Sequence, residues 1–434
     1  MSFDVKTAFL HAQLPYSIYV NQIPGYPEDN PRTVLKLLVT LYGLKQSAYE
    51  WYKLLSNVLN SLGVLRCEAD HAVFVRRWAT PPHPSIPAST SDAPLTLIIP
   101  IHVDDGLVIS NSLPLCKWFA SEMSKKIDFV CLGAVVNSQY LGHQIICDRP
   151  NKIIKISWAD LINDLLEDWC MKNCKLANVP LSNSLHKLPP CSPNACSEIP
   201  DQDIIVTYQR LAGSLTYLAI CTCPDIAYTA MSLGQYNSSP TCAHLVIAKE
   251  VLQYLAGTVD LCLVFSCSNQ SLPLSVQPYT ETCGLSDADW ASDKKDRRSI
   301  SGYCFYYFNC LVSWSAQKQC TVSTSSTESK YYALSSTIKE AIWIQLFLSL
   351  MKLPSPKTLP VLCDNQSSQA IANTDTISSC TKHIDASYHF IREHIANGSF
   401  SMIWIPTSDM VADIFTKPLL HILFSQHHTS LGLV

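Results

Sequence analysis

Two adjacent aspartates, Asp104 and Asp105, interrupt an otherwise apolar stretch over residues 101–110, "IHVDDGLVIS". Neighbouring carboxylates repel each other, and burial strengthens that repulsion. One interpretation is a solvent-facing hairpin turn, because Asp-Asp-Gly between two apolar runs is a strong turn signal. The other is a cation site, in which a bound positive charge offsets the repulsion. The stretch by itself leaves both interpretations open.

Four further aspartates accompany apolar, strand-like runs, and we expect each to lie at a strand end. Asp4 lies in "FDVKTAFL", Asp287 in "GLSDADWA", Asp364 in "LPVLCDNQ" and Asp413 in "ADIFTKPL". Hard divalent cations prefer oxygen ligands. Two such ions about 4 Å apart can hold both the attacking and the leaving oxygen of a phosphodiester. That geometry needs three or four carboxylates that converge from different strands, so each half of the chain carries candidates for one such site.

The elements that must position these residues alternate between helix and strand in both halves. This interleaving favours α+β or α/β architecture. Ser325 and Glu328 form the S-x-x-E pattern of a capping box at a helix start. Proline- and serine-rich stretches over 78–94, 186–203 and 266–281 indicate loops or joints. Apolar spacing predicts helices over 47–63, 208–220, 244–258 and 328–350, and strands over 70–77, 95–103, 301–316 and 359–365.

Composition bounds the class of protein. A chain of 434 residues is expected to form two or three domains. Its 47% hydrophobic and 15% charged residues exclude general disorder, and a net charge of −4 means that any nucleic acid must be held by a local positive track. Nineteen cysteines without C-x-x-C spacing or a secretory signal favour reduced, buried thiols in an intracellular protein. We expect no membrane span, because no apolar run approaches the ~18 residues required.

Several blocks in fixed order are characteristic, among them "DVKTAFLHAQL", "LYGLKQSAYEWY", "HVDDGLVIS", "STSSTESKYYAL" and "ADIFTKPL". With these blocks the chain resembles the C-terminal part of the Pol polyprotein of copia-type LTR retrotransposons. The resemblance implies an α+β fold, with a palm-type reverse transcriptase subdomain and helical connection or thumb before a ribonuclease H-like α/β domain. We expect a partial reverse transcriptase over 1–185, the thumb over 186–277, ribonuclease H over 278–420 and a tail over 421–434.

The resemblance also implies roles in the first half. Asp4, Asp104 and Asp105 are expected to meet on the palm sheet and bind two Mg²⁺ or Mn²⁺ ions. Lys45 and Gln46 are expected to contact the incoming nucleotide or the template, although a purely structural role at a helix start is equally open.

In the second half, Asp287, Asp364 and Asp413 match three of the four metal-binding carboxylates of the family's ribonuclease H. The fourth position departs from the family pattern Glu-x-Glu-Tyr, whose second glutamate is a ligand. This chain reads Glu-Ser-Lys-Tyr over 328–331, so Lys330 replaces that glutamate. We expect Lys330 to project toward Asp287 and Asp364 and to pair with one or both.

Other departures leave the function divided between two hypotheses. His102 stands where the family has tyrosine, and with Met1 three positions before Asp4 we expect the fingers to be missing. The first hypothesis is an RNA-directed DNA polymerase with ribonuclease H, acting on RNA template, DNA primer, RNA–DNA hybrid and deoxynucleoside triphosphates in the cytoplasm, in a virus-like particle or in the nucleus. The second is a catalytically inactive remnant that at most binds nucleic acid. A metal-dependent nuclease alone is disfavoured, because its own carboxylate set is the altered one.

Overall fold

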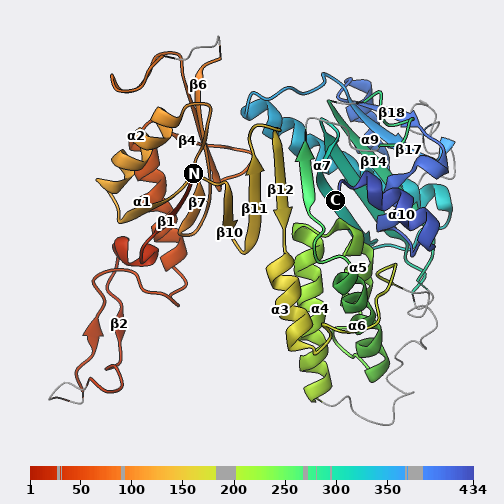
Figure 1. Cartoon of the computed structure of the whole chain (residues 1–434), viewed down its shortest axis with the longest axis horizontal. Helices are drawn as coiled ribbons and strands as arrows, with labels where there is room; N and C mark the ends of the chain where they lie inside the picture. The colour runs from red at the N-terminus through yellow and green to blue at the C-terminus, as the bar shows by residue number, and fades with distance from the viewer. Residues whose placement is uncertain are drawn as a thin grey trace. The chain divides into compact units, whose positions relative to one another are not determined.

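The computed structural model of the chain describes residues 1–26, 30, 32–88, 93–181, 202–266, 272–279, 281–293, 296–366, 369 and 385–434 (Figure 1). Their contacts divide them into unit 1, Met1–Val136, and unit 2, Asn137–Val434. The predicted boundary at residues 185 and 186 lies outside the described residues, and the other predicted domain limits remain predictions.

The elements of unit 1 are β1 (Ser2–Val5), η1 (Ala8–His11), β2 (Tyr19–Val20), β3 (Leu35–Lys36), α1 (Ser47–Ser61), β4 (Leu65–Arg66), β5 (Val73–Trp78), β6 (Leu95–His102), β7 (Asp105–Leu107), β8 (Ile109–Ser110), α2 (Leu113–Ser124) and β9 (Phe129–Gly133). Seven strands form one sheet in the order β4-β5-β6-β7-β1-β9, with β8 paired to β6. This order places β1, which carries Asp4, directly beside the β6–β7 hairpin.

The sheet of unit 1 is half-buried. Every second residue of β6 is buried from Leu95 to Ile101, which is the period of a strand with one covered face. Helices α1 and α2 lie beside the strands (Figure 1) and contribute Trp51, Leu55 and Phe119 to the same core. The predicted helix over 47–63 is confirmed by α1, and the predicted strands over 70–77 and 95–103 are confirmed by β5 and β6, which pair with each other.

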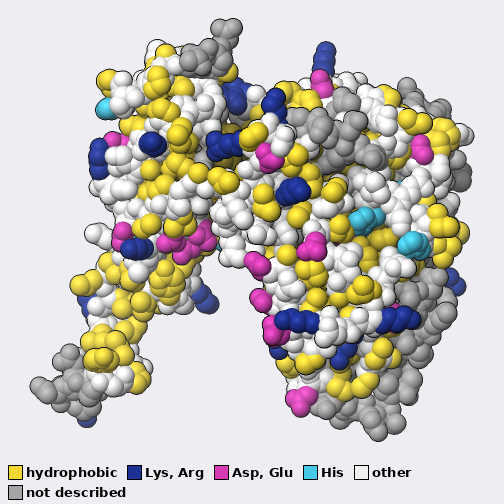
Figure 2. All heavy atoms as spheres, in the orientation of Figure 1, with side chains coloured by type: hydrophobic (Ala, Val, Ile, Leu, Met, Phe, Trp, Pro, Cys, Tyr) yellow, Lys and Arg dark blue, Asp and Glu magenta, His cyan; other side chains and the backbone are white. Residues whose placement is uncertain are grey.

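A two-stranded arm, formed by β2 and β3 with their flanking residues, carries exposed apolar side chains (Figure 2). It is joined to the rest of unit 1 where the Thr40 N–H donates to the carbonyl oxygen of Ala12 at 2.9 Å. A pair of strands this short is marginal by itself, so the arm depends on the rest of unit 1. Its most exposed apolar side chains are Tyr16, Tyr19, Ile23, Tyr26, Val34 and Leu38.

The elements of unit 2 are β10 (Asn137–Tyr140), β11 (His143–Asp148), β12 (Ile153–Ser157), α3 (Ala159–Asp168), α4 (Gln202–Cys221), η3 (Pro224–Ile226), α5 (Ala227–Gly234), α6 (Cys242–Gly257), β13 (Leu263–Ser266), β14 (Thr282–Asp289), β15 (Ile300–Tyr307), β16 (Cys310–Lys318), α7 (Ser326–Leu350), β17 (Leu359–Cys363), α9 (Asp385–Ala396), β18 (Phe400–Trp404), η5 (Thr407–Asp409), η6 (Val411–Phe415) and α10 (His421–Ser430). The predicted helices over 208–220, 244–258 and 328–350 and the strands over 301–316 and 359–365 are confirmed by α4, α6, α7, β15, β16 and β17.

Two sheets organise unit 2. Strands β10-β11-β12-β13 form an antiparallel sheet, and β16-β15-β14-β17-β18 form a mixed one, in which β17 runs parallel to both β14 and β18. Helix α7 packs on β14, whose residues are buried except the last. The mixed α/β character expected for this half is therefore observed. Within the described residues the largest core cluster joins α4–α6 to β14, β15 and α10.

The start of α7 shows half of the predicted capping box. The Ser325 hydroxyl oxygen accepts from the backbone N–H of Glu328 at 3.1 Å. The carboxylate of Glu328 accepts from the N–H and the hydroxyl of Thr324, both at 2.6 Å, rather than from the N–H of Ser325. The cap thereby fixes the first turn of the helix that carries Lys330.

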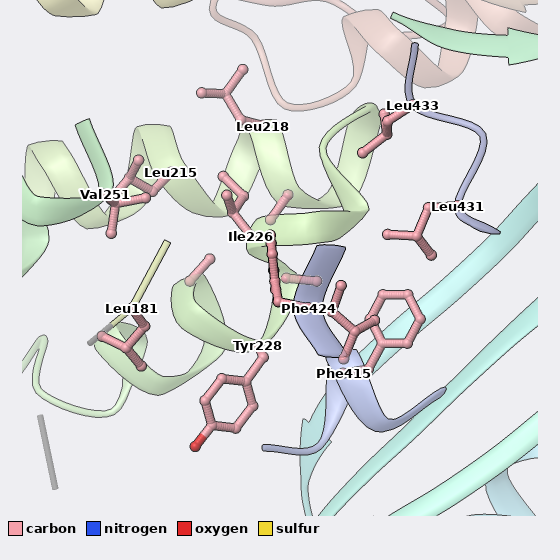
Figure 3. Close-up of a cluster of buried hydrophobic side chains, with 14 of the residues drawn as sticks. Leu181, Leu215, Leu218, Ile226, Tyr228, Val251, Phe415, Phe424, Leu431 and Leu433 are labelled. Carbon is pink, nitrogen blue, oxygen red and sulfur yellow. The ribbon is translucent and has the colours of Figure 1, made fainter. Parts of the chain in front are cut away.

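The C-terminal residues, which the sequence suggested as a tail, contribute to the core of unit 2. The backbone N–H of Val264 donates to the carbonyl oxygen of Gly432 at 3.0 Å, and Leu433 pairs with Leu263. Figure 3 shows Leu215, Leu218, Ile226, Val251, Phe415, Phe424, Leu431 and Leu433 gathered in one buried cluster.

Helix α4 differs from the sequence expectation in one respect. By length and composition it is apolar enough to cross a membrane, and among the described helices it alone passes that test. Its buried residues belong to the shared core of unit 2.

Candidate functional sites

The first carboxylate group lies where β1 meets the tip of the β6–β7 hairpin. Asp4 stands opposite Asp105 in the antiparallel register of β1 and β7, and His102 stands opposite Asp105 on its other side. Residues directly opposite in such a pair share a face, with Cβ atoms about 5 Å apart. Asp104, the residue before Asp105, lies at the tip of the hairpin, and its carbonyl oxygen accepts from the N–H of Val5 at 3.0 Å. The fold therefore brings the three predicted aspartates together.

The tip of the hairpin is held from a second side by α1. The indole N–H of Trp51, which is 2% exposed, donates to the carbonyl oxygen of Val103 at 2.7 Å. Val103 has φ +58°, a left-handed conformation that is strained for a β-branched residue. Such strain persists only where neighbouring contacts impose it, and the bonds from Trp51 and Val5 supply those contacts.

The turn itself is displaced by one residue from the sequence expectation. Asp105 and Gly106 belong to β7, and Val103 and Asp104 form the two-residue turn. Gly106 is needed for close approach rather than for turning, because a Cβ added there would lie 2.1 Å from Cζ of Phe3. Phe3 pairs with Gly106 in register, so the ring fills the space that the missing side chain leaves.

The electrostatics of this group favour a cation. Burial raises the pKa of Asp105, and the negative charges of Asp104 and Asp4 raise it further, while the nearby His102 opposes them. A divalent ion would offset this repulsion, so the donor set fits the Mg²⁺ or Mn²⁺ that the family resemblance implies. Within the described residues no group of three or more His, Cys, Asp or Glu side chains is already drawn together as a metal site, so ion binding here would require these side chains to close.

Lys45 and Gln46 lie at the start of α1, with Lys45 exposed and Gln46 at the N-cap position. Trp51 and the half-buried Tyr52 of the same helix pack into the core of unit 1, as expected if Lys45 and Gln46 serve only to start this helix. The geometry is compatible with either role that the sequence left open for Lys45 and Gln46.

The second carboxylate group, in unit 2, is closed by lysine. Lys330 Nζ lies 3.0 Å from Asp287 Oδ1 and also donates to Asp364 Oδ1. Lys330 was predicted to pair with one or both aspartates, and it pairs with both. The buried Asp287 side chain lies within β14, and Asp364 follows β17 directly. Because β14 and β17 are adjacent and parallel, their two carboxylates reach the same ammonium group from α7.

Asp413 adds a third carboxylate and a second lysine. It lies in the 3-10 helix η6 rather than at a strand end, which corrects the sequence expectation. Four residues further on, Lys417 places Nζ 2.8 Å from Asp413 Oδ2. The hydroxyl of Thr416 donates to Asp287 Oδ2 at 2.7 Å, which ties η6 to β14. The Asp-x-x-x-Lys spacing is the local signal by which the sequence could have indicated this second pair, which was not predicted.

The pKa values in this group diverge. Burial raises the pKa of Asp413 to about 8, and the adjacent charge of Asp287 acts in the same direction. For Asp287 burial acts upward too, but the charge of Lys330 and the hydrogen bonds of the site outweigh it and lower its pKa. Asp287 is therefore the charged partner of Lys330. A donor set with an ammonium group between two of its carboxylates does not fit a divalent cation.

Known proteins resemble the chain over most of its length. Residues 1–183 match the family model described as "Reverse transcriptase (RNA-dependent DNA polymerase)". The chain is 32% identical, over 95% of its length, to the retrovirus-related Pol polyprotein from transposon TNT 1-94 of Nicotiana tabacum, of which it covers 29%. It is 31% identical, over 78% of its length, to a Saccharomyces cerevisiae protein named for transposon Ty5-1, of which it covers 99%.

Among solved structures, RNase H1 from Halobacterium salinarum aligns with 31% of this chain and 94% of its own, at 10% identity and a TM-score of 0.23. A TM-score this low does not establish a shared fold, so the assignment rests on the sequence relatives. The chain spans less than a third of the TNT 1-94 polyprotein, yet it covers almost all of the yeast relative. With both units inside these matches, the chain belongs to the family of copia-type retrotransposon Pol polyproteins.

Proposed function

We propose that unit 1 carries the nucleotidyl-transfer site of an RNA-directed DNA polymerase, with Asp4, Asp104 and Asp105 as its carboxylate set. The observation that carries the proposal is the register of β1 and β7, which sets Asp4 opposite Asp105 beside a tip held by Trp51. The match of residues 1–183 to the reverse transcriptase family supports it, since that range contains all three aspartates.

The proposed arrangement assigns a role to each part of the chain. The seven-stranded sheet of unit 1 would be the palm, and helices α4–α6 the thumb or connection. Strands β14–β18 with α7 would form the ribonuclease H-like domain. These assignments follow the order of the elements along the chain and the extent of the family resemblance.

The chain's own residues would act by collecting and aiming oxygen ligands. Bound Mg²⁺ would activate the primer 3′-hydroxyl and neutralise the departing pyrophosphate. Asp4 and Asp105 would present carboxylates from adjacent strands, and Trp51 would fix the peptide that precedes Asp104. The exposed Lys45 would add positive charge for a triphosphate or template phosphate. Positioning of this kind supplies most of the acceleration in phosphoryl transfer.

The test is primer extension by the purified 434-residue chain on an RNA template with a DNA primer, Mg²⁺ or Mn²⁺ and deoxynucleoside triphosphates. We expect template-dependent extension that Asp104→Asn lowers at least about 100-fold, since residues that only orient metal ligands already cost about 10–100-fold. The exposed Asp128 of the same unit supplies the control, and Asp128→Asn should leave extension unchanged. Absence of extension, or extension that survives Asp104→Asn, would overturn the proposal.

A second candidate function, a non-catalytic remnant, is favoured by one observation in unit 2. Lys330 occupies the carboxylate group to which the family resemblance assigns RNA–DNA hybrid cleavage. We therefore do not extend the proposed activity to hybrid cleavage.

A further inference from the structure

The carboxylates of Asp287, Asp364 and Asp413 form the most deeply buried charged cluster of the described chain. Their side chains are 1%, 7% and 1% exposed, whereas those of Lys330 and Lys417 are 19% and 34% exposed. Buried carboxylates are costly unless each is paired and hydrogen-bonded. The partners of each oxygen therefore decide whether the cluster needs a metal ion.

Almost every carboxylate oxygen in the cluster has a donor from the protein. For Asp287, Oδ1 pairs with Lys330 and Oδ2 accepts from Thr416 at 2.7 Å. For Asp364, Oδ1 accepts from Lys330 and Oδ2 accepts from Thr407 at 2.9 Å.

Asp413 completes the set. Its Oδ2 pairs with Lys417 at 2.8 Å, and a hydrogen bond joins its carboxyl group to that of Asp287. A cation entering the cluster would not find the several free oxygens that a hard divalent ion requires.

Charge and position exclude the ion as well. The ammonium group of Lys330 lies between Asp287 and Asp364, which is the volume that a cation bridging them would fill. A divalent ion there would meet two positive charges, from Lys330 and Lys417, within one low-dielectric site. Breaking the Lys330 pairs to admit it would leave the ammonium group beside a divalent cation that repels it.

The cluster also ties together segments that are far apart in the sequence. Lys330 comes from α7, Asp287 from β14 and Asp364 from the end of β17, while Thr416 and Lys417 follow η6. We propose that Lys330 replaces the divalent cation between Asp287 and Asp364, and that these three residues, with the bond from Thr416 to Asp287, form a metal-independent ion-pair lock that holds α7 and η6 on the sheet. The lock binds no Mg²⁺ or Mn²⁺ and cleaves no RNA–DNA hybrid.

The experiment counts Mn²⁺ ions bound to the full chain by electron paramagnetic resonance, in an Asp4→Asn, Asp104→Asn, Asp105→Asn background that removes all three candidate ligands of unit 1. We expect no Mn²⁺ bound at low millimolar concentration and no change in melting temperature between EDTA and Mg²⁺. Lys330→Glu should raise Mn²⁺ affinity at least about tenfold, because it removes a positive charge and adds two oxygen ligands. This outcome is independent of whether unit 1 extends primers.

A matched pair of substitutions tests the structural role. Lys330→Met should lower the melting temperature of the full chain by roughly 5–10 °C, because it leaves buried carboxylates unpaired. Lys318 is the control. Its side chain is 20% exposed and pairs with Asp293 and Asp296, which are 19% and 36% exposed and so less buried than Asp287 and Asp364; Lys318→Met should therefore cost much less.

Three results would overturn the lock. One is an Mn²⁺ ion bound by the parent chain and lost in Asp287→Asn. Another is hybrid cleavage by the parent chain that Asp364→Asn abolishes. The third is a melting temperature unchanged by Lys330→Met. The first two measurements use the parent chain and so remain decisive even if Lys330→Met fails to fold.

Discussion

The indole N–H of Trp51 reaches from α1 to the carbonyl oxygen of Val103 at 2.7 Å, at the tip of the hairpin that carries Asp104 and Asp105. The two residues are 52 positions apart, and the ring is buried. The bond holds a β-branched residue at φ +58°. Helix α1 thus fixes the backbone conformation immediately before Asp104.

Trp51→Phe should lower Mn²⁺ affinity of the unit 1 aspartates by about tenfold, because a residue that orients a metal ligand is typically worth 10–100-fold. The phenyl ring keeps most of the packing, while the N–H donor is lost. Electron paramagnetic resonance of free and bound Mn²⁺ measures the change. Trp118, which packs edge-on against Trp78 in the same unit, supplies the control, and Trp118→Phe should leave the affinity unchanged.

If Trp51→Phe lowers the melting temperature but leaves the Mn²⁺ affinity unchanged, then Trp51 contributes only to packing. A Trp51→His variant, which restores a ring N–H, should recover part of the affinity if the bond to Val103 is what matters.

Gly106→Ala should destabilise unit 1 by about 1–3 kcal/mol, the usual cost of overpacking a core. An added Cβ would lie 2.1 Å from Cζ of Phe3, which is buried at 1% exposure. Chemical denaturation followed by tryptophan fluorescence measures the change. The double variant Phe3→Leu, Gly106→Ala should be more stable than Gly106→Ala alone, since the smaller side chain releases the clash.

Gly213→Ala is the opposite case. Gly213 lies inside α4 with nothing within 4 Å of the added Cβ, so alanine should stabilise unit 2 by about 0.5–1 kcal/mol through helix propensity. Equal effects of the two glycine substitutions would contradict the packing argument for Gly106.

The sequence predicted the elements of this fold well because their signals are local. Helices α1, α4, α6 and α7 follow from apolar periodicity and the β5–β6 pair from strand composition. The pairing of Lys330 was predictable because this lysine replaces a glutamate of the family pattern, at a helix position that the resemblance places beside Asp287 and Asp364. The position of the hairpin turn was not predictable, because Asp-Gly indicates a turn wherever it occurs. Here Gly106 instead leaves room for the ring of Phe3.

The contacts that the sequence did not reveal are long-range. Nothing local in the chain connects Trp51 to Val103, Thr416 to Asp287, or Thr407 to Asp364. They arise only once the sheets have brought the segments together. Only the Asp413–Lys417 pair had a local signal, its spacing of one helical turn.

The C-terminal residues should be required for the stability of unit 2. Leu431 has no exposed surface, so Leu431→Ala should cost about 2–5 kcal/mol in the free energy of unfolding. Ile422 lies in the neighbouring α10 but is 84% exposed, and Ile422→Ala should cost less than about 0.5 kcal/mol. Denaturant titration of both variants checks the difference. Equal stability would mean that these residues form the tail that the sequence suggested.

His427 should make unit 2 sensitive to acid. It is fully buried in α10, and neither ring nitrogen has a hydrogen-bond partner among the described residues. Burial lowers the pKa of His427 from 6.5 to about 4, and the positive charge of Lys417 adds to the effect while Asp409 opposes it. Between these pH values the unfolded chain binds a proton that the folded chain does not. The contribution of His427 is therefore complete above pH 6.5 and is lost as the pH falls toward 4, by about 3 kcal/mol in total.

The measurement is the free energy of unfolding at several pH values between 4 and 7.5, for the parent chain and for His427→Leu. Leucine loses no hydrogen bond, because the imidazole makes none with the described residues, and it cannot bind a proton. The variant should therefore lose stability less steeply on acidification than the parent, by roughly 3 kcal/mol over the window. His421 lies exposed at the start of the same helix, so His421→Leu should keep the parent's slope. If His427→Leu shows the parent's slope as well, the acid sensitivity arises from other groups and His427 is protonated equally in both states.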